Sequence, residues 1–173
     1  IITYKRTDRF VKNTYTVKDK DGQPKMAGGK PVTAVAHGLV GELWVHGLMF
    51  ETIERMDGYM HMKGGQTYYG SAIYWHEKYK SFVINPALGD TQEATKGNIL
   101  MHPGSRPSHV QGCIAVGFFD ANGLLTDSKY CFDVLRDQAG GASAPKEAWV
   151  KLTLVVEGHM PALSACKPWV YSA

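Results

Sequence analysis

Alternation of hydrophobic and polar residues is the main structural signal in this chain, and it predicts β-strands. It is clearest over residues 148–156, where Val150, Leu152 and Leu154 alternate with less apolar positions. Residues 1–18 mix β-branched, aromatic and charged residues, which predicts one or two exposed strands. Shorter runs of strand-forming residues predict further strands at 68–75, 82–84, 98–102 and 113–117.

A β-hairpin is predicted where two apolar runs meet at a glycine. Residues 38–47 and 48–55 each alternate imperfectly, and Gly47 separates them. We expect Trp44 to lie on a sheet face or in the core, and His46 to be solvated at the turn.

The periodicity changes to a helical one only over residues 126–138. Thr126 or Asp127 is suited to cap the N-terminus of this helix, and Gly140 follows its end. Residues at i, i+4 spacing form one apolar stripe that we expect to face the core: Tyr130 with Val134, and Cys131 with Leu135.

These elements predict a mainly β (α+β) fold, a small mixed β-sheet or partly closed barrel with one packed helix. With 173 residues, the chain is expected to form a single domain. Within it, residues 39–157 form the expected core, residues 1–36 add N-terminal strands and a loop, and residues 158–173 form a tail. This tail is expected to wrap the domain or serve as a contact.

Composition narrows the function classes. Hydrophobic residues make up 44% and charged residues 20%, typical of a globular protein. The net charge of +3 favours an anionic surface such as a cell wall, but no clustered basic face indicates nucleic acid. No apolar run is long enough to span a membrane, and no signal peptide is visible.

The three cysteines leave two redox states open. A Cys131–Cys166 disulfide with Cys113 reduced would suit a protein outside the cytoplasm, whereas three reduced thiols are the simpler expectation. No group of residues has zinc-ligand spacing, and the methionine-rich segment 56–62 is more typical of adaptable packing than of a metal site. We therefore expect neither a metal nor a cofactor.

The candidate chemistry lies in one loop between two predicted strands. His102 ends the first strand, and Cys113 begins the second after Gly112. An imidazole can take the proton of a thiol and return it to a leaving amine, and backbone N–H groups near Gly112 and Cys113 can stabilise an oxyanion. Ser105, Ser108 or a backbone carbonyl could orient the imidazole. In the alternative interpretation, Cys113 is a small core residue and His102 is merely solvated.

Four stretches, in order, carry a family resemblance: Gly41-Glu-Leu-Trp44, Gly65-Gln-Thr-Tyr68, Ile99-Leu-Met-His-Pro-Gly104 and Gly112-Cys-Ile-Ala-Val-Gly117. Together they resemble the L,D-transpeptidases, specifically the short-loop relatives found in phages and among type VI secretion effectors. The resemblance covers roughly residues 39 to 157.

The resemblance implies a peptidoglycan-directed enzyme whose catalytic residues are Cys113, His102 and Gly112. The nucleophile Cys113 would be acylated by a stem peptide next to diaminopimelate. Resolution by water would make the protein an L,D-carboxypeptidase or endopeptidase, and resolution by an amine a transpeptidase or D-amino-acid exchange enzyme. The substrate-contacting residues would be Gly104, Ser105, Arg106, Ser108 and His109.

The resemblance also implies a biological setting. The protein would act in the bacterial periplasm, after secretion or delivery, as an antibacterial effector or a phage lysis protein. An effector would have a cognate immunity protein that plugs the cleft.

The polar loop Pro86–Lys96 is expected to border the substrate or simply to connect two strands.

Two positions depart from the family pattern. Val110 stands where L,D-transpeptidases usually carry Ser or Thr, and Ala115 stands where many carry Arg. These departures favour an alternative function, a non-catalytic phage or wall-binding module with the same fold. A papain-like protease is disfavoured because the histidine closely precedes the cysteine and no predicted helix follows Cys113.

Overall fold

In the computed structural model of the chain, residues 1–59, 61–86 and 99–172 are described. In chain order the strands are β1 (Ile2–Thr16), β2 (Met26–Ala27), β3 (Lys30–Pro31), β4 (Thr33–Val45), β5 (Leu48–Arg55), β6 (Thr67–His76), β7 (Ser81–Asn85), β8 (Met101–His102), β9 (Ile114–Phe119), β10 (Leu125–Thr126), β11 (Val150–Glu157) and β12 (Lys167–Pro168). The helical elements are η1 (Pro107–His109), α2 (Ser128–Arg136), the π-turn η2 (Asp137–Gly141) and η3 (Leu163–Ala165).

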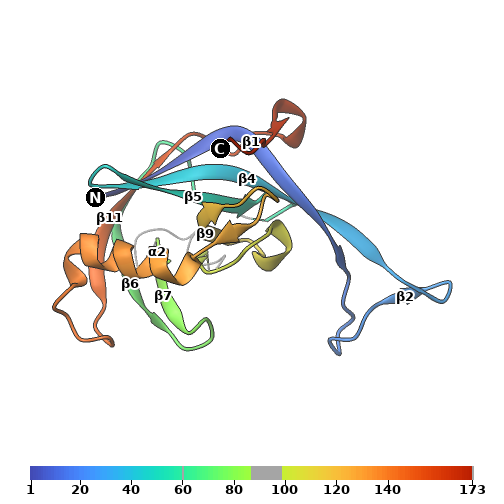
Figure 1. The fold of residues 1–173 in the computed structure, drawn as a ribbon, viewed down its shortest axis with the longest axis horizontal. Helices are drawn as coiled ribbons and strands as arrows, with labels where there is room; N and C mark the ends of the chain where they lie inside the picture. The colour runs from blue at the N-terminus through green and yellow to red at the C-terminus, as the bar shows by residue number, and fades with distance from the viewer. Residues whose placement is uncertain (60, 87–98, 173) are drawn as a thin grey trace.

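The strands form a mixed sheet that is partly ring-like. Its order is β10-β9-β5-β4-β1-β11-β6-β7-β8, and an additional pairing joins β8, at one end of this path, to β9, next to the other end. The pairs β1–β11 and β8–β9 are parallel, whereas most others are antiparallel. The predicted mainly β architecture, with a mixed sheet and a packed helix, is therefore confirmed (Figure 1).

The predicted hairpin is confirmed as β4 and β5, which pair in continuous register from Gly38↔Arg55 to Val45↔Leu48. Its two-residue turn consists of His46 and Gly47, whose φ angles are +45° and +80°. Two positive φ angles match the right-handed twist of the strands, and glycine adopts this conformation without steric cost.

The N-terminal segment forms one strand rather than two, and its first part is not exposed. β1 pairs with β11 on one side and β4 on the other, so Ile2 and Tyr4 are buried. Beyond a register shift after Arg6, β1 and β4 continue past the body as a two-stranded arm ending in the β2–β3 hairpin (Figure 1). The C-terminal tail returns to this strand, where β12 pairs with it in parallel.

The predicted helix is confirmed as α2, but of its two expected cap residues Thr126 is wrong and Asp127 is right only in its position. Thr126 belongs to β10, and its hydroxyl donates to the Phe118 carbonyl. Asp127 occupies the N-cap position in a left-handed conformation without a side-chain cap. Cys131 and Leu135 are buried as expected, whereas Tyr130 is 63% exposed. Phe132 takes a core position, because the face that packs on the sheet is the one shared by Cys131, Phe132 and Leu135.

Two hydrophobic clusters lie on opposite faces of β9. Ile114 and Val116 belong to the larger one, which also contains Met101 from β8 and Phe132 from α2. Ala115 belongs to the smaller cluster, against which Cys113 packs. Because successive residues of a strand point to opposite faces, Cys113 and Ala115 lie on the outer face.

Candidate functional site

The parallel pairing of β8 and β9 brings His102 and Cys113 to the same place. The paired residues are Met101 with Ile114 and His102 with Ala115. The N–H of Ile114 donates to the Leu100 carbonyl at 2.9 Å, which extends the pairing by one residue. His102 therefore lies beside Ala115 on the outer face, as a diagonal neighbour of Cys113.

His102 is held in one orientation and one tautomer. Its side chain is only 2% exposed, and Nδ1 lies 2.8 Å from the Pro103 carbonyl oxygen. A carbonyl can only accept, so Nδ1 carries the hydrogen and Nε2 keeps its lone pair. The backbone carbonyl of Pro103 therefore orients the imidazole, and not the side chain of Ser105 or Ser108.

An aromatic ring covers the imidazole. Tyr79, in the turn between β6 and β7, stacks on His102 with ring centroids 4.3 Å apart and planes inclined by 12°. Burial is the main cause that lowers the pKa of His102 below its usual value, and the positive charge of Lys78 acts in the same direction. His102 is therefore neutral at pH 7, as a general base must be.

Cys113 is half-buried at the start of β9, and burial raises the pKa of its thiol. The backbone of Leu100 and the charge of Lys78 oppose this rise without cancelling it. At neutral pH the pair thus rests as a thiol and a neutral imidazole, not as a thiolate–imidazolium ion pair.

Gly112 has a left-handed backbone conformation that favours glycine over other residues. Its φ is +78°, in the left-handed region that residues with a side chain rarely adopt. A Cβ atom there would also approach Cδ1 of Tyr59 to 3.0 Å. Glycine therefore lets the chain turn tightly into Cys113 above the ring of Tyr59.

The remaining predicted site residues belong to the loop 103–112, where several contact one another. The N–H of Ser105 donates to Nδ1 of His109 at 3.2 Å. Two hydrogen bonds connect Ser108 with the side chain of Asn13, from β1. The N–H of Ser108 donates to Oδ1 of Asn13, and the hydroxyl of Ser108 accepts from its Nδ2. Arg106 has a buried Nε without a hydrogen-bond partner among the described residues. The loop Pro86–Lys96, apart from Pro86, lies outside the described residues.

Arg55, at the end of β5, is a supporting residue that the sequence did not reveal. Its Nη1 donates to the carbonyls of Pro107 and Val110, both at 3.2 Å, and its Nε donates to Asp57 at 2.7 Å. Its backbone N–H reaches the Cys113 carbonyl at 3.4 Å. The residue is only 4% exposed, so it holds the loop from within the molecule.

The two departures from the family pattern have a packing explanation. Val110 and Ala115 are fully buried in the smaller hydrophobic cluster. Gly104 lies directly above Ala115, since a Cβ on this glycine would approach that of Ala115 to 3.2 Å. Polar side chains at positions 110 and 115 would therefore be buried in an apolar environment, which is costly without hydrogen-bond partners.

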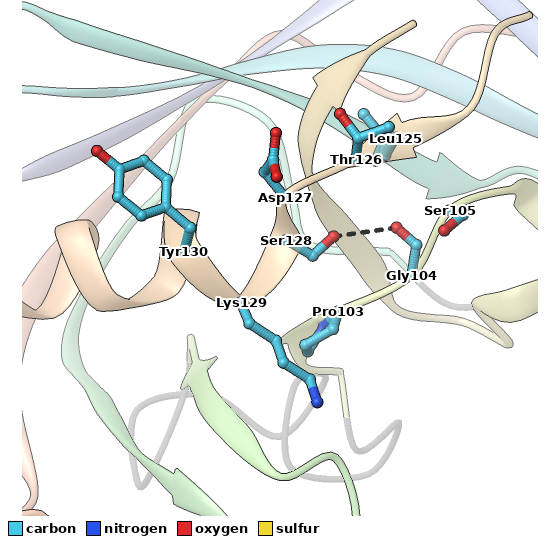
Figure 2. A pocket seen from close by; sticks show the side chains of 9 residues that line it. All are labelled: Pro103, Gly104, Ser105, Leu125, Thr126, Asp127, Ser128, Lys129 and Tyr130. Carbon is cyan, nitrogen blue, oxygen red and sulfur yellow. Dashed lines mark hydrogen bonds between the residues drawn. The ribbon is translucent and has the colours of Figure 1, made fainter.

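A surface pocket of about 650 Å³ lies next to this loop. It is bounded by Pro103, Gly104 and Ser105 on one side and by residues 125–130 on the other, with the Ser128 hydroxyl donating to the Gly104 carbonyl at 3.2 Å (Figure 2). The pocket thus shares Pro103, Gly104 and Ser105 with the loop 103–112, whereas neither His102 nor Cys113 lines it.

Three kinds of alternative site are not observed in the described part of the chain. No group of three or more His, Cys, Asp or Glu side chains there is arranged to hold a metal. The cysteines at 113, 131 and 166, all in that part, form no disulfide. No helix among the described residues is long and apolar enough to cross a membrane.

Comparisons of the chain with protein-family models, with curated proteins and with solved structures find no match.

Proposed function

We propose that this protein is a peptidoglycan-directed cysteine enzyme of the L,D-transpeptidase type. The observation that carries the proposal is the parallel β8–β9 pairing, which makes His102 a diagonal neighbour of Cys113, while Nδ1 of His102 donates to the Pro103 carbonyl. The motif resemblance supplies the substrate class.

The first step of the proposed reaction forms a thioester. Nε2 of His102 takes the thiol proton as Sγ of Cys113 attacks a stem-peptide carbonyl, and backbone N–H groups near Gly112 stabilise the oxyanion. The carbon–nitrogen bond then breaks, and His102 returns the proton to the leaving amine. Water or another amine releases the acyl group and restores the thiol.

The test is incubation of purified protein with diaminopimelate-type muropeptides, followed by mass spectrometry. Wild-type protein should remove a terminal D-alanine, exchange it for another D-amino acid, or split a cross-link, and Cys113→Ala should do none of these. Cys166→Ala is the matched control, because that thiol lies in the C-terminal tail and binds the Ala162 carbonyl. Folded wild-type protein that leaves every muropeptide unchanged would refute the proposal for this substrate class.

A non-catalytic wall-binding module is the second candidate function. It is favoured by the apolar side chains at positions 110 and 115, which leave the site without two of the family's polar groups. In this case wild-type protein and Cys113→Ala would sediment equally with purified cell-wall sacculi, and neither would change their muropeptides.

A further inference from the structure

The turn between β6 and β7 presents two side chains to the candidate site. The Tyr79 ring stacks on His102, and Nζ of Lys78 lies 5.5 Å from the centre of that ring. The phenol ring of Tyr79 is therefore a common neighbour of the imidazole and of the ammonium group. An ammonium group near an aromatic face is attracted by the ring quadrupole, which favours this placement.

Lys78 differs from Lys80, two residues further along the same turn. Nζ of Lys80 is neutralised by Glu77, whose Oε2 lies 2.7 Å away. Lys78 is exposed, and none of the ion pairs between described residues includes it. It is also the charge that acts on both Cys113 and His102, since its field lowers the pKa of each. One turn thus carries a lysine paired with Glu77 and a lysine that forms no ion pair with another described residue.

We propose that Lys78 binds a carboxylate of the acyl donor at Cys113, so that the protein selects peptides with a carboxylate next to the bond that is cut. This inference rests on the proposed function and names the substrate chemistry of its site. It also accounts for Ala115, since a cation supplied from the neighbouring turn removes the need for one on β9.

Two carboxylates of a stem peptide have this chemistry. One is the free terminal carboxylate of the leaving residue, and the other is the side-chain carboxylate of the diaminopimelate. Recognition of the terminal one would make a carboxypeptidase or exchange reaction, rather than cross-link cleavage, the natural outcome. Selective amidation of either group distinguishes the two sources.

The first experiment needs no turnover. The rates at which iodoacetate and iodoacetamide alkylate Cys113 are measured at pH 7.5 by peptide mass spectrometry, and their ratio is compared between proteins. The ratio isolates attraction of the carboxylate, because any change in the thiolate fraction affects both reagents equally. Relative to wild type, Lys78→Met should lower the ratio by about two- to fivefold, as expected for an exposed ion pair.

Two control variants and a test at high salt make this result specific. Lys78→Arg should keep the wild-type ratio because it keeps the charge. Lys80→Met should also keep it, because that lysine is already paired with Glu77. High salt should reduce the difference between wild type and Lys78→Met. An equal ratio in wild type and Lys78→Met at low salt would overturn the inference, whether or not the protein proves to be a peptidoglycan enzyme.

The second experiment identifies the carboxylate. Wild type and Lys78→Met are compared on three tetrapeptide stems: the free acid, the terminal amide and the diaminopimelate side-chain amide. In wild type, one amide should raise KM by about two- to fivefold, and in Lys78→Met that amide and the free acid should be equivalent. If wild type turns over all three stems with the same KM, the inference fails while the proposed function stands.

Discussion

At the scale of single residues, protonation states decide how the candidate pair would work. The pKa of His102 lies below 6.5 and that of Cys113 above 9.0, each shifted mainly by burial. In the proposed reaction the imidazole would therefore accept the thiol proton as the thiol attacks, instead of holding it beforehand. This is a general-base arrangement, in contrast to enzymes whose cysteine is already ionised.

This assignment predicts two pH profiles. Alkylation of Cys113 by iodoacetamide should rise with pH through a midpoint above 9.0, because only the thiolate reacts. On muropeptides, kcat/KM should decrease in acid with a midpoint below pH 6.5, because His102 stops acting as a base only when it becomes protonated. A plateau of alkylation between pH 6 and 8 would instead indicate a preformed thiolate–imidazolium pair and contradict the assignment.

Gly112 provides a second prediction at this scale. Gly112→Ala should lower the free energy of unfolding by about 1–2 kcal/mol, because alanine is strained at positive φ and its Cβ would press on Tyr59. Urea denaturation measures this change. The neighbouring exposed residue supplies the control, since Gln111→Ala should stay within about 0.5 kcal/mol of wild type. Equal losses in both variants would show that the glycine conformation is not required.

At the scale of elements, the loop 103–112 is held by β5. Arg55 is the residue that connects them, through two carbonyls of the loop and through Asp57, which also binds His37. The loop thus depends on a strand that is distant in sequence. Arg55 acts on the site through this loop and is a positioning residue.

Replacing Arg55 by lysine should loosen the loop, because one ammonium group cannot reproduce the planar arrangement of donors. Hydrogen–deuterium exchange of the amides of 103–113 should accelerate by about tenfold, which corresponds to the loss of about 1.4 kcal/mol of local stability. The matched control is Arg9→Lys on β1, where the arginine is exposed and only weakly paired with Asp8. Unchanged exchange in Arg55→Lys would show that other contacts position the loop.

At the scale of the whole molecule, a buried ionic network joins segments across the sheet. Glu54 on β5 accepts hydrogen bonds from Tyr4 and Arg6 on β1, and Arg6 also donates to the Met62 and Gly158 carbonyls. The side chains of Glu54 and Arg6 are 3% and 1% exposed. Although burial opposes ionisation, hydrogen bonds and the positive charge of Arg6 lower the pKa of Glu54 to about 2.

Global stability should therefore depend on pH in acid. A carboxylate whose pKa is lower in the folded state contributes stability above its unfolded value of 4.5, and this contribution is lost as the pH falls towards 2. Glu54→Gln should cost about 3 kcal/mol at pH 7, since it leaves Arg6 buried without its counter-ion. Thermal or urea unfolding at pH 7 and pH 3 measures both effects.

The control for this prediction is an exposed ion pair of the same sheet. Lys5 and Glu157 lie 3.9 Å apart with side chains 44% and 55% exposed, so Glu157→Gln should change stability by less than about 0.5 kcal/mol. A loss of stability in Glu54→Gln that is as small as in Glu157→Gln, or that persists unchanged at pH 3, would contradict the role of the network.

Much of the local structure could be predicted because it depends on neighbours in sequence. Alternation identified β11, and Gly47 identified the β4–β5 turn, since strand faces and positive φ angles are local properties. The helix caps failed because Thr126 joins a strand pair with Phe118, a tertiary contact that overrides its capping preference. The prediction for Tyr130 was wrong because tertiary packing chose the face of Cys131, Phe132 and Leu135, which leaves Tyr130 exposed.

The sequence by itself determined the strand-forming segments, the helix and a glycine before Cys113, because these follow from side-chain period and backbone freedom. Only the tertiary structure decided that β8 runs beside β9, and therefore that His102 faces the same side as Cys113. The same is true of Arg55, Tyr79 and Lys78, which reach the site from other strands and a distant turn. Contacts between segments far apart in the chain depend on how the whole sheet closes, so a local sequence pattern does not predict them.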